Sequence, residues 1–348
     1  MPEDRPGTPS CPTRRDVLAL GARFGAGALV SVSLTACGIR LEDDAPRGAG
    51  EPSRRPVRGE SFLLALRRHS IDLAAEATAL GGPAKALPAR LAALHRRQSE
   101  VLRTELLRLG VPASVVDGSA APSGTATTTA KTTAASTGTG PTGAAPSGPA
   151  PTASGTTGPR ALAASEAGDL GPAAVADLAG VPADVLPLAG ALLAQRAAAA
   201  ALLGTPATWP EPSWSAPSLA ASYLQGTRAA VYAFQVVAAQ SPTGAQRTLA
   251  RTTLAVLEAR QARQESLAGA AAAPPPLAYP LPFAVTTPAA ARKLAAHVLT
   301  ELLAAVARDL GSTGGEVGPL GAVVQWLADT EVLASRWGVA LAPFPGLT

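Results

Sequence analysis

Few side chains in this sequence have the types and spacing that catalysis or metal binding requires. The chain holds three histidines, and none has a glutamate three residues before it, as a di-iron helical bundle needs in its Glu-x-x-His motifs. The best remaining cluster is His69, Asp72 and Glu76, which share one face of a predicted helix. These are weak metal candidates, because a solvated polar stripe opposite an apolar face has the same spacing. We therefore expect no metal and no other cofactor.

The other charged groups are expected on surfaces. His95 stands in the run His-Arg-Arg-Gln, which predicts a basic helix face. Arg260 and Arg263 lie near two glutamates on another predicted helix, so we interpret them as a salt-bridged surface, with an anion-binding face as the alternative. In the loop Tyr-Pro-Leu-Pro-Phe, the aromatic side chains of Tyr279 and Phe283 fit either an interface or a cap on the helices.

A third chemical feature is an export and lipidation signal at the N-terminus. Arg14 and Arg15 form a twin-arginine pair, and a weakly apolar run follows over residues 17–34. The run is too polar for a membrane span, which needs about 20 apolar residues, but it suits a twin-arginine export signal. It ends in Leu34-Thr35-Ala36-Cys37, which resembles a bacterial lipobox whose cysteine receives the lipid. Residues 1–36 are predicted to be a signal peptide that is removed.

Composition and cysteine usage agree with export and lipidation. Cys11 lies within the predicted signal, so Cys37 is left as the one cysteine of the mature chain and no intramolecular disulfide can form. The formal charge of +4 is too weak and too evenly spread to indicate a nucleic-acid partner. We expect a protein on the extracytoplasmic face of the cell membrane, held by a fatty-acyl anchor such as palmitate.

The elements that position these side chains are predicted to be helices. Aromatic residues make up only 3% of the chain and alanine dominates its apolar content, which favours an all-α fold. Periodic apolar stripes and Gly/Pro breaks predict two helical bundles. The predicted parts are a tether (37–59), an N-terminal bundle (60–204) with a disordered Ser/Thr/Pro/Gly insertion (117–158), a linker (205–217) and a C-terminal domain (218–348).

Within the N-terminal bundle we expect an αα-hairpin of helices 61–80 and 87–109, followed by helices 161–178 and 183–203. Within the C-terminal domain, four stripes of Leu, Val and Ala with a long second connection predict a four-helix bundle. The pairs Ser241-Pro242 and Thr287-Pro288 place a capping residue before a first-turn proline, and each is predicted to begin a helix.

The C-terminal segment also resembles a known family. The resemblance rests on four short motifs: Ala229-Ala-Val-Tyr-Ala-Phe234, Tyr279-Pro-Leu-Pro-Phe-Ala-Val-Thr286, Arg336-Trp337 and Phe344-Pro-Gly-Leu347. They are similar to the C-terminal ferritin-like domain of unknown function found in actinobacterial lipoproteins. The resemblance implies a ferritin-like four-helix bundle and an envelope location, and it supplies no catalytic residues.

Two classes of function stay open. We favour a non-enzymatic, membrane-anchored lipoprotein whose helical domains bind a partner or ligand in the envelope. The alternative is a metal-binding ferritin-like oxidoreductase or storage protein that uses non-standard ligands.

Overall fold

The structure of the chain, a computed structural model, describes residues 54–118, 158–168, 170–209 and 212–347. The predicted export signal, Cys37 and nearly all of the predicted insertion lie outside the described residues. The described part is all-helical, with no strand, which confirms the predicted fold class. The described helices are α1 (Glu60–Ala79), α2 (Leu87–Arg108), α3 (Ala113–Val116), α4 (Pro159–Gly168), α5 (Pro172–Ala179), α6 (Leu186–Leu202), α7 (Pro217–Gln240), α8 (Ala245–Ala268), α9 (Pro288–Arg308) and α10 (Val317–Arg336), with 3₁₀ turns at Gly269–Ala271 and Asp309–Thr313.

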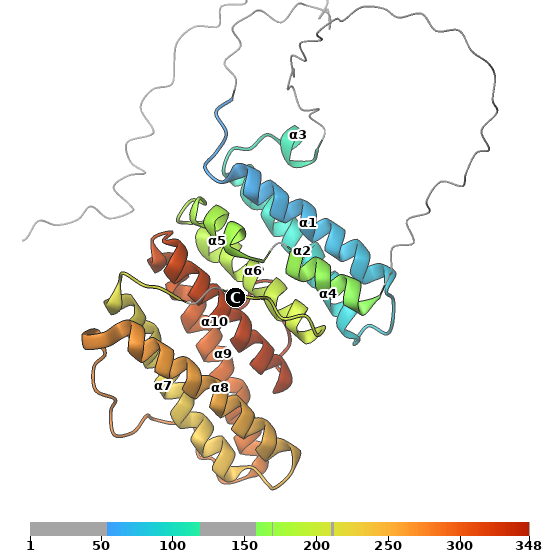
Figure 1. The fold of residues 1–348 in the computed structure, drawn as a ribbon. Coiled ribbons are helices and arrows are strands. Elements are labelled where there is room, and N and C mark those ends of the chain that lie inside the picture. Colours follow the sequence, from blue (N-terminus) through green and yellow to red (C-terminus); the bar gives the residue numbers. More distant parts are fainter. Residues whose placement is uncertain (1–53, 119–157, 169, 210–211, 348) are drawn as a thin grey trace, which may run out of the picture. The chain divides into compact units, whose positions relative to one another are not determined.

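The predicted N-terminal hairpin is present. Helices α1 and α2 pack side by side along most of their length (Figure 1). The stripe residues Leu66 and Leu73 of α1 and Leu102 of α2 are buried, as the periodicity predicts. At the end of the hairpin, Arg103 and Arg67 bind the carboxylate of Asp117 and lower its pKa, chiefly through the hydrogen bond from Arg103. Asp117 is thus held by α1 and α2, although the sequence placed it in the disordered insertion.

Two predicted helix boundaries are wrong. The stretch 161–178 is not one helix, because α4 ends at Gly168 and α5 begins at Pro172. Proline disfavours the helical conformation in the residue before it, and Gly171 is fully extended. Ser241 does not cap the next helix. It ends α7, where its Oγ donates to the carbonyl of Val237 at 2.7 Å. Thr287 does cap α9, where its side chain accepts from the Ala290 N–H at 3.1 Å.

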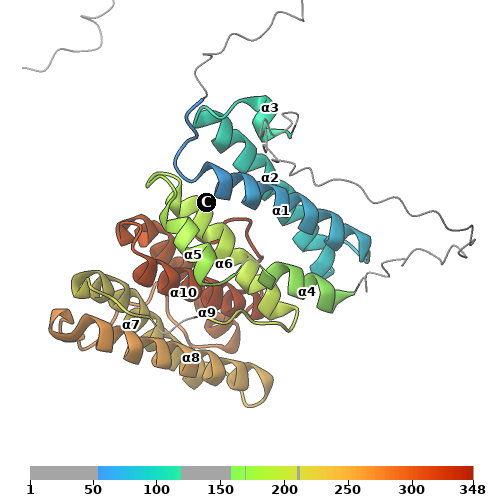
Figure 2. The ribbon, with the colours of Figure 1, turned by 45° about the horizontal axis from the view of Figure 1, so that its top comes forward.

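Helix α6 lies at the centre of the packing. All residues from Ala189 to Ala200 are buried, as expected of a helix that is covered on every side. It packs against α4 and α10, and α10 packs in turn against α9, as Figures 1 and 2 show. Buried residues before and after the predicted linker (205–217) therefore belong to one apolar core, and Ala207, Trp209 and Trp214 of the linker pack against it. The division into two bundles stays a prediction.

The C-terminal helices meet in pairs. Helix α7 packs against both α8 and α9, and α9 packs against α10. Phe234 of α7 contacts Trp337 edge to face, with ring centroids 5.8 Å apart. Trp214, which precedes α7, stacks on Trp326 of α10 with ring centroids 5.3 Å apart. No helix among the described residues combines the length and the apolar character needed to cross a membrane.

Candidate functional site

A hollow of about 310 Å³ lies between α7, α9 and the loop that precedes α9. Its floor on α7 is made of small residues, Gly226, Ala229, Ala230 and Ala233, which share one helix face by their spacing. Because these side chains are short, α7 and α9 leave room between them. Val298, Leu302 and Ala305 of α9 complete an apolar lining.

The loop over residues 279–282 forms one wall of this hollow. Tyr279, a predicted interface residue, lines it and is half-buried, and its ring lies 5.8 Å from that of Tyr232. Its hydroxyl is buried and has no hydrogen-bond partner among the described residues. Phe283, the other predicted interface residue, packs on α9, where the ammonium of Lys293 lies 5.0 Å from the ring centroid. The two aromatic side chains therefore fix the loop against the helices.

Arg228 anchors the start of the same loop. Its guanidinium is only 7% exposed, pairs with the carboxylate of Glu265 at 2.9 Å and donates to the carbonyl of Ala273 at 2.6 Å. An arginine held by two partners in this way fixes backbone position as well as charge. The loop wall is thus attached to α7 and α8 independently of any ligand.

The rim of the hollow is polar. His297, Glu301 and Arg308 line it from one face of α9, and all three are exposed. His297 and Glu301 stand four residues apart on α9, a spacing that places two side chains next to each other on a helix surface. An apolar floor and a polar rim suit a small ligand with an apolar body and one polar group.

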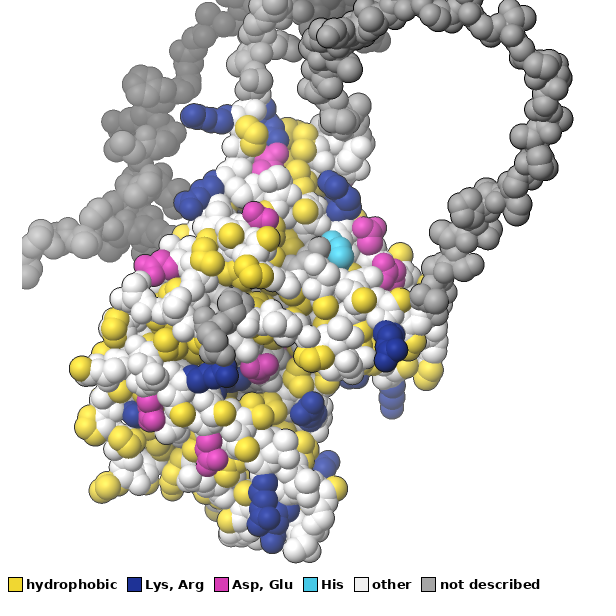
Figure 3. Space-filling view, in the orientation of Figure 1, with side chains coloured by type: hydrophobic (Ala, Val, Ile, Leu, Met, Phe, Trp, Pro, Cys, Tyr) yellow, Lys and Arg dark blue, Asp and Glu magenta, His cyan; other side chains and the backbone are white. Residues whose placement is uncertain are grey.

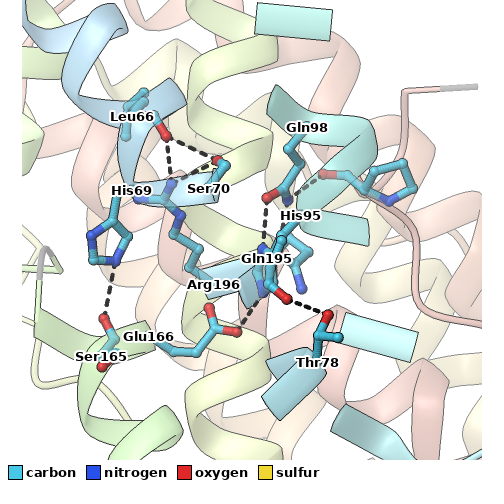
Figure 4. Close-up of polar contacts among 12 residues, drawn as sticks. Leu66, His69, Ser70, Thr78, His95, Gln98, Ser165, Glu166, Gln195 and Arg196 are labelled. Atoms are coloured by element: carbon cyan, nitrogen blue, oxygen red, sulfur yellow. Dashed lines mark hydrogen bonds and ion pairs between the residues drawn. The ribbon is translucent and has the colours of Figure 1, made fainter. Parts of the chain in front are cut away.

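A second cluster of polar side chains is buried between α2, α4 and α6 (Figure 4). The ring of His95 pairs through Nε2 with Glu166 at 2.7 Å and through Nδ1 with Gln98 at 2.9 Å. The amide of Gln98 also donates to Gln195 and to the carbonyl of Pro343, each at 2.8 Å. His95, Glu166 and Gln98 are fully buried. The prediction that His95 lies on a basic surface is wrong.

The physical reason is the helical spacing of His95. It lies four residues after Leu91 and seven before Leu102, on the face of α2 that packs inward, while its neighbours Arg96 and Arg97 point outward. This spacing was visible in the sequence and is the signal that could have found it. Sequence reasoning also missed Arg196 of α6, which is fully buried and donates to the carbonyl of Leu66 at 2.8 Å.

The weak metal candidates do not converge in the described structure. His69 lies 3.2 Å from the carbonyl oxygen of Ser165, whereas Asp72 and Glu76 are exposed on the next turns of α1. No group of three or more His, Cys, Asp or Glu side chains within the described ranges is placed to hold a metal ion.

The interior of the C-terminal helices is more polar than the sequence analysis predicted. Beside Leu, Val and Ala, the buried set includes Thr253, Arg260, Gln264, Thr330 and Glu331. Arg260, predicted on a salt-bridged surface, is 4% exposed and donates to Thr330 Oγ1 at 2.7 Å. The hydroxyl of Thr253 accepts from the indole N–H of Trp337 at 3.0 Å. These two hydrogen bonds join α8 to α10 and to the residue that follows it.

The described residues form an all-helical fold with polar side chains in its interior and a ligand-sized hollow between α7, α9 and the 279–282 loop. Residues 220–348 match the family described as Domain of unknown function (DUF4439), so the chain carries a domain of this family at its C-terminus. No match to the chain was found among curated proteins or among solved structures.

Proposed function

We propose that this protein is an exported, lipid-anchored lipoprotein that binds a small ligand outside the cytoplasmic membrane. The anchor is supported by the order of the N-terminal features: Arg14-Arg15, a weakly apolar run and the lipobox-like Leu34-Thr35-Ala36-Cys37. The helices begin at Glu60, which leaves a tether of about twenty residues after Cys37. A lipid with two acyl chains on Cys37 holds such a protein more firmly than one chain would.

The single observation that carries the binding function is the hollow of about 310 Å³ between α7, α9 and the 279–282 loop. Its volume is at the lower end of the range for ligand pockets. Its apolar floor favours a hydrocarbon or aromatic body, and the rim residues His297 and Arg308 supply polar contacts. In this proposal the ligand is bound and is not chemically changed.

The ferritin-like arrangement of α7–α10 belongs to the same proposal. It is supported by the pairwise packing of α7 with α8 and α9, by the packing of α9 with α10, and by the long connection between α8 and α9. The alternative function, a metal-binding oxidoreductase or storage bundle, is tested directly by elemental analysis. Near-stoichiometric Fe, Mn or Zn in the purified protein would replace the binding proposal with this alternative.

The binding site is tested with N-phenyl-1-naphthylamine, an apolar probe whose fluorescence rises in apolar surroundings. The substitution Ala229→Phe fills the hollow from α7, and Ala239→Phe adds the same side chain to an exposed position on the same helix outside the hollow. We expect the wild-type protein and the Ala239→Phe control to bind the probe alike and Ala229→Phe to lose at least tenfold in affinity, about 1.4 kcal/mol. Equal binding by both variants would contradict the proposal.

A further inference from the structure

Two hollows flank the segment Leu170-Gly171-Pro172 at the start of α5. The first, of about 360 Å³, lies between α1 and α5, and Phe62 is its largest side chain. The second, of about 530 Å³, lies against the residues that follow α6, where Trp209 lines it. Because both linings include Leu170, Gly171 and Pro172, the two hollows adjoin, and we call them together the α5 groove.

The α5 groove is apolar and reached by solvent. Of the described residues that line it, only Asp177, Thr208 and Trp209 carry a polar side-chain group, whereas Pro172 and Ala173 are apolar and exposed. Figure 3 shows hydrophobic side chains gathered over α5. The groove shares no residue with the hollow between α7 and α9. Covering apolar surface is worth about 25 cal/mol per Å², so such a groove favours an apolar partner.

The chain toward Cys37 leaves the described structure beside this groove. The guanidinium of Arg58 donates to the carbonyl of Ala179, the last residue of α5, at 3.3 Å. Gly59 follows and packs so closely that a Cβ atom added to it would lie 3.0 Å from the Cα of Val181. Because α5 is only about 12 Å long, the groove at its start lies about one such length from this contact.

A lipid on Cys37 places the membrane near the same face. The described chain begins at Arg54, which is 54 − 37 = 17 positions after the cysteine. A flexible chain of that length spans about 20–25 Å root mean square. The bilayer surface is therefore within reach of the α5 groove without any rearrangement of the helices.

The side chains of the groove suit a lipid surface. Tryptophan concentrates where a bilayer meets water, and Trp209 is half-buried in the lining. Charge decides little here, because exposed Arg55 and Arg58 precede α1 but Asp177 lines the groove. We infer that the α5 groove docks on the phospholipid bilayer that holds the anchor and receives its acyl chains. The inference rests on the lipid anchor of the proposed function and is additional to the ligand of the hollow between α7 and α9.

The inference is tested on the mature lipidated protein, reconstituted into vesicles of phosphatidylcholine and phosphatidylglycerol whose acyl chains are brominated near the head group. Bromine quenches tryptophan fluorescence on contact, and the signal lost in Trp209→Phe assigns the emission of Trp209. We expect at least half of this emission to be quenched, and the quenching to persist at high salt because apolar contact carries it. Trp326 and Trp337 are buried and should stay unquenched.

A matched pair of variants tests the groove itself. Ala173→Glu places a charge in the groove from an exposed position in the first turn of α5, and Ala245→Glu places one at an exposed position in the first turn of α8, outside the groove. A carboxylate near a helix N-terminus is favourable, so both variants are expected to fold, which thermal melting checks. We expect Ala173→Glu to lose the quenching of Trp209 and Ala245→Glu to keep it.

Vesicle-bound wild-type protein without quenching of Trp209, quenching that high salt removes, or equal quenching in the two variants would each overturn the inference and leave the anchor standing. Absent quenching together with a sedimentation coefficient that rises with protein concentration would assign the groove to a second copy of the chain instead. Protein that carries no lipid and does not pellet with the vesicles would refute the anchor, and the inference with it. Ala229→Phe should leave the quenching unchanged, which separates the groove from the proposed ligand site.

Discussion

The buried carboxyl group of Glu331 makes the stability of the folded chain depend on pH. The side chain lies on α10 and is 1% exposed, and one of its oxygens accepts from the N–H of Ala342 at 2.9 Å. Burial raises the pKa of Glu331 from its ordinary value of 4.5 to about 7, while the hydrogen bond from Ala342 works in the opposite direction. The folded protein therefore keeps this proton over a pH range in which the unfolded chain has released it.

The size and sign of the effect follow from the two pKa values, which differ by 7 − 4.5 = 2.5. At 1.36 kcal/mol for each pKa unit, the folded state loses about 3 kcal/mol relative to the unfolded state once Glu331 is ionised in both. Below about pH 4.5 both states hold the proton and there is no penalty. As the pH rises toward 7, the unfolded state binds fewer protons than the folded state, so the free energy of unfolding falls.

The test replaces the carboxyl by an amide. Glu331→Gln keeps an oxygen that can accept from Ala342, but it cannot ionise. We expect its free energy of unfolding in urea to exceed that of the wild-type protein, and the excess to be about 2.5 kcal/mol greater at pH 8.5 than at pH 5. Glu258→Gln removes an exposed carboxylate on α8 and serves as the control, with no such pH-dependent difference. An excess that is the same at both pH values would refute the reasoning.

Three further predictions concern the anchor, the buried network and the insertion. Cys37→Ala should leave the protein unprocessed or release it from the membrane fraction, and unchanged retention would contradict the lipid anchor; replacing both Arg14 and Arg15 by Lys should block export. His95→Leu leaves the carboxylate of Glu166 buried without its 2.7 Å partner, so we expect a loss of about 3–5 kcal/mol in the free energy of unfolding, measured in urea. Deletion of residues 119–157 should change the melting temperature little, because a longer loop adds only a slowly growing entropy cost, and loss of folding would argue against a disordered insertion.

The helices could be predicted from the sequence because their apolar periodicity is strong. Leu66 and Leu73 stand seven residues apart, two turns of one helix, and both are buried in α1. The residue Thr287 before Pro288 likewise marks the start of α9 through local chemistry alone. Such signals arise within a few residues of the chain, so one sequence is enough to find them.

The polar interior could not be predicted in the same way. His95 is buried because Glu166, 71 positions later, and Gln98 supply its partners, and no local pattern pairs them. Arg260 depends on Thr330, 70 positions away, and was placed on the surface because a charged residue in a helix is usually exposed. The hollow between α7 and α9 was missed for a related reason: a run of small residues predicts close packing as readily as it predicts space.

The contact between Gln98 and the carbonyl of Pro343 joins residues 245 positions apart. Three residues after Pro343, Gly346 packs closely against α9. A Cβ atom added at Gly346 would lie 2.3 Å from the carbonyl oxygen of Leu303, so a larger residue does not fit there. During synthesis, Gln98 of the first hairpin cannot form this hydrogen bond until Pro343, near the end of the chain, has left the ribosome. The packing of the N-terminal helices is therefore completed only when the C-terminus is present. A chain truncated before Pro343 would leave the buried amide of Gln98 in α2 without this hydrogen-bond partner.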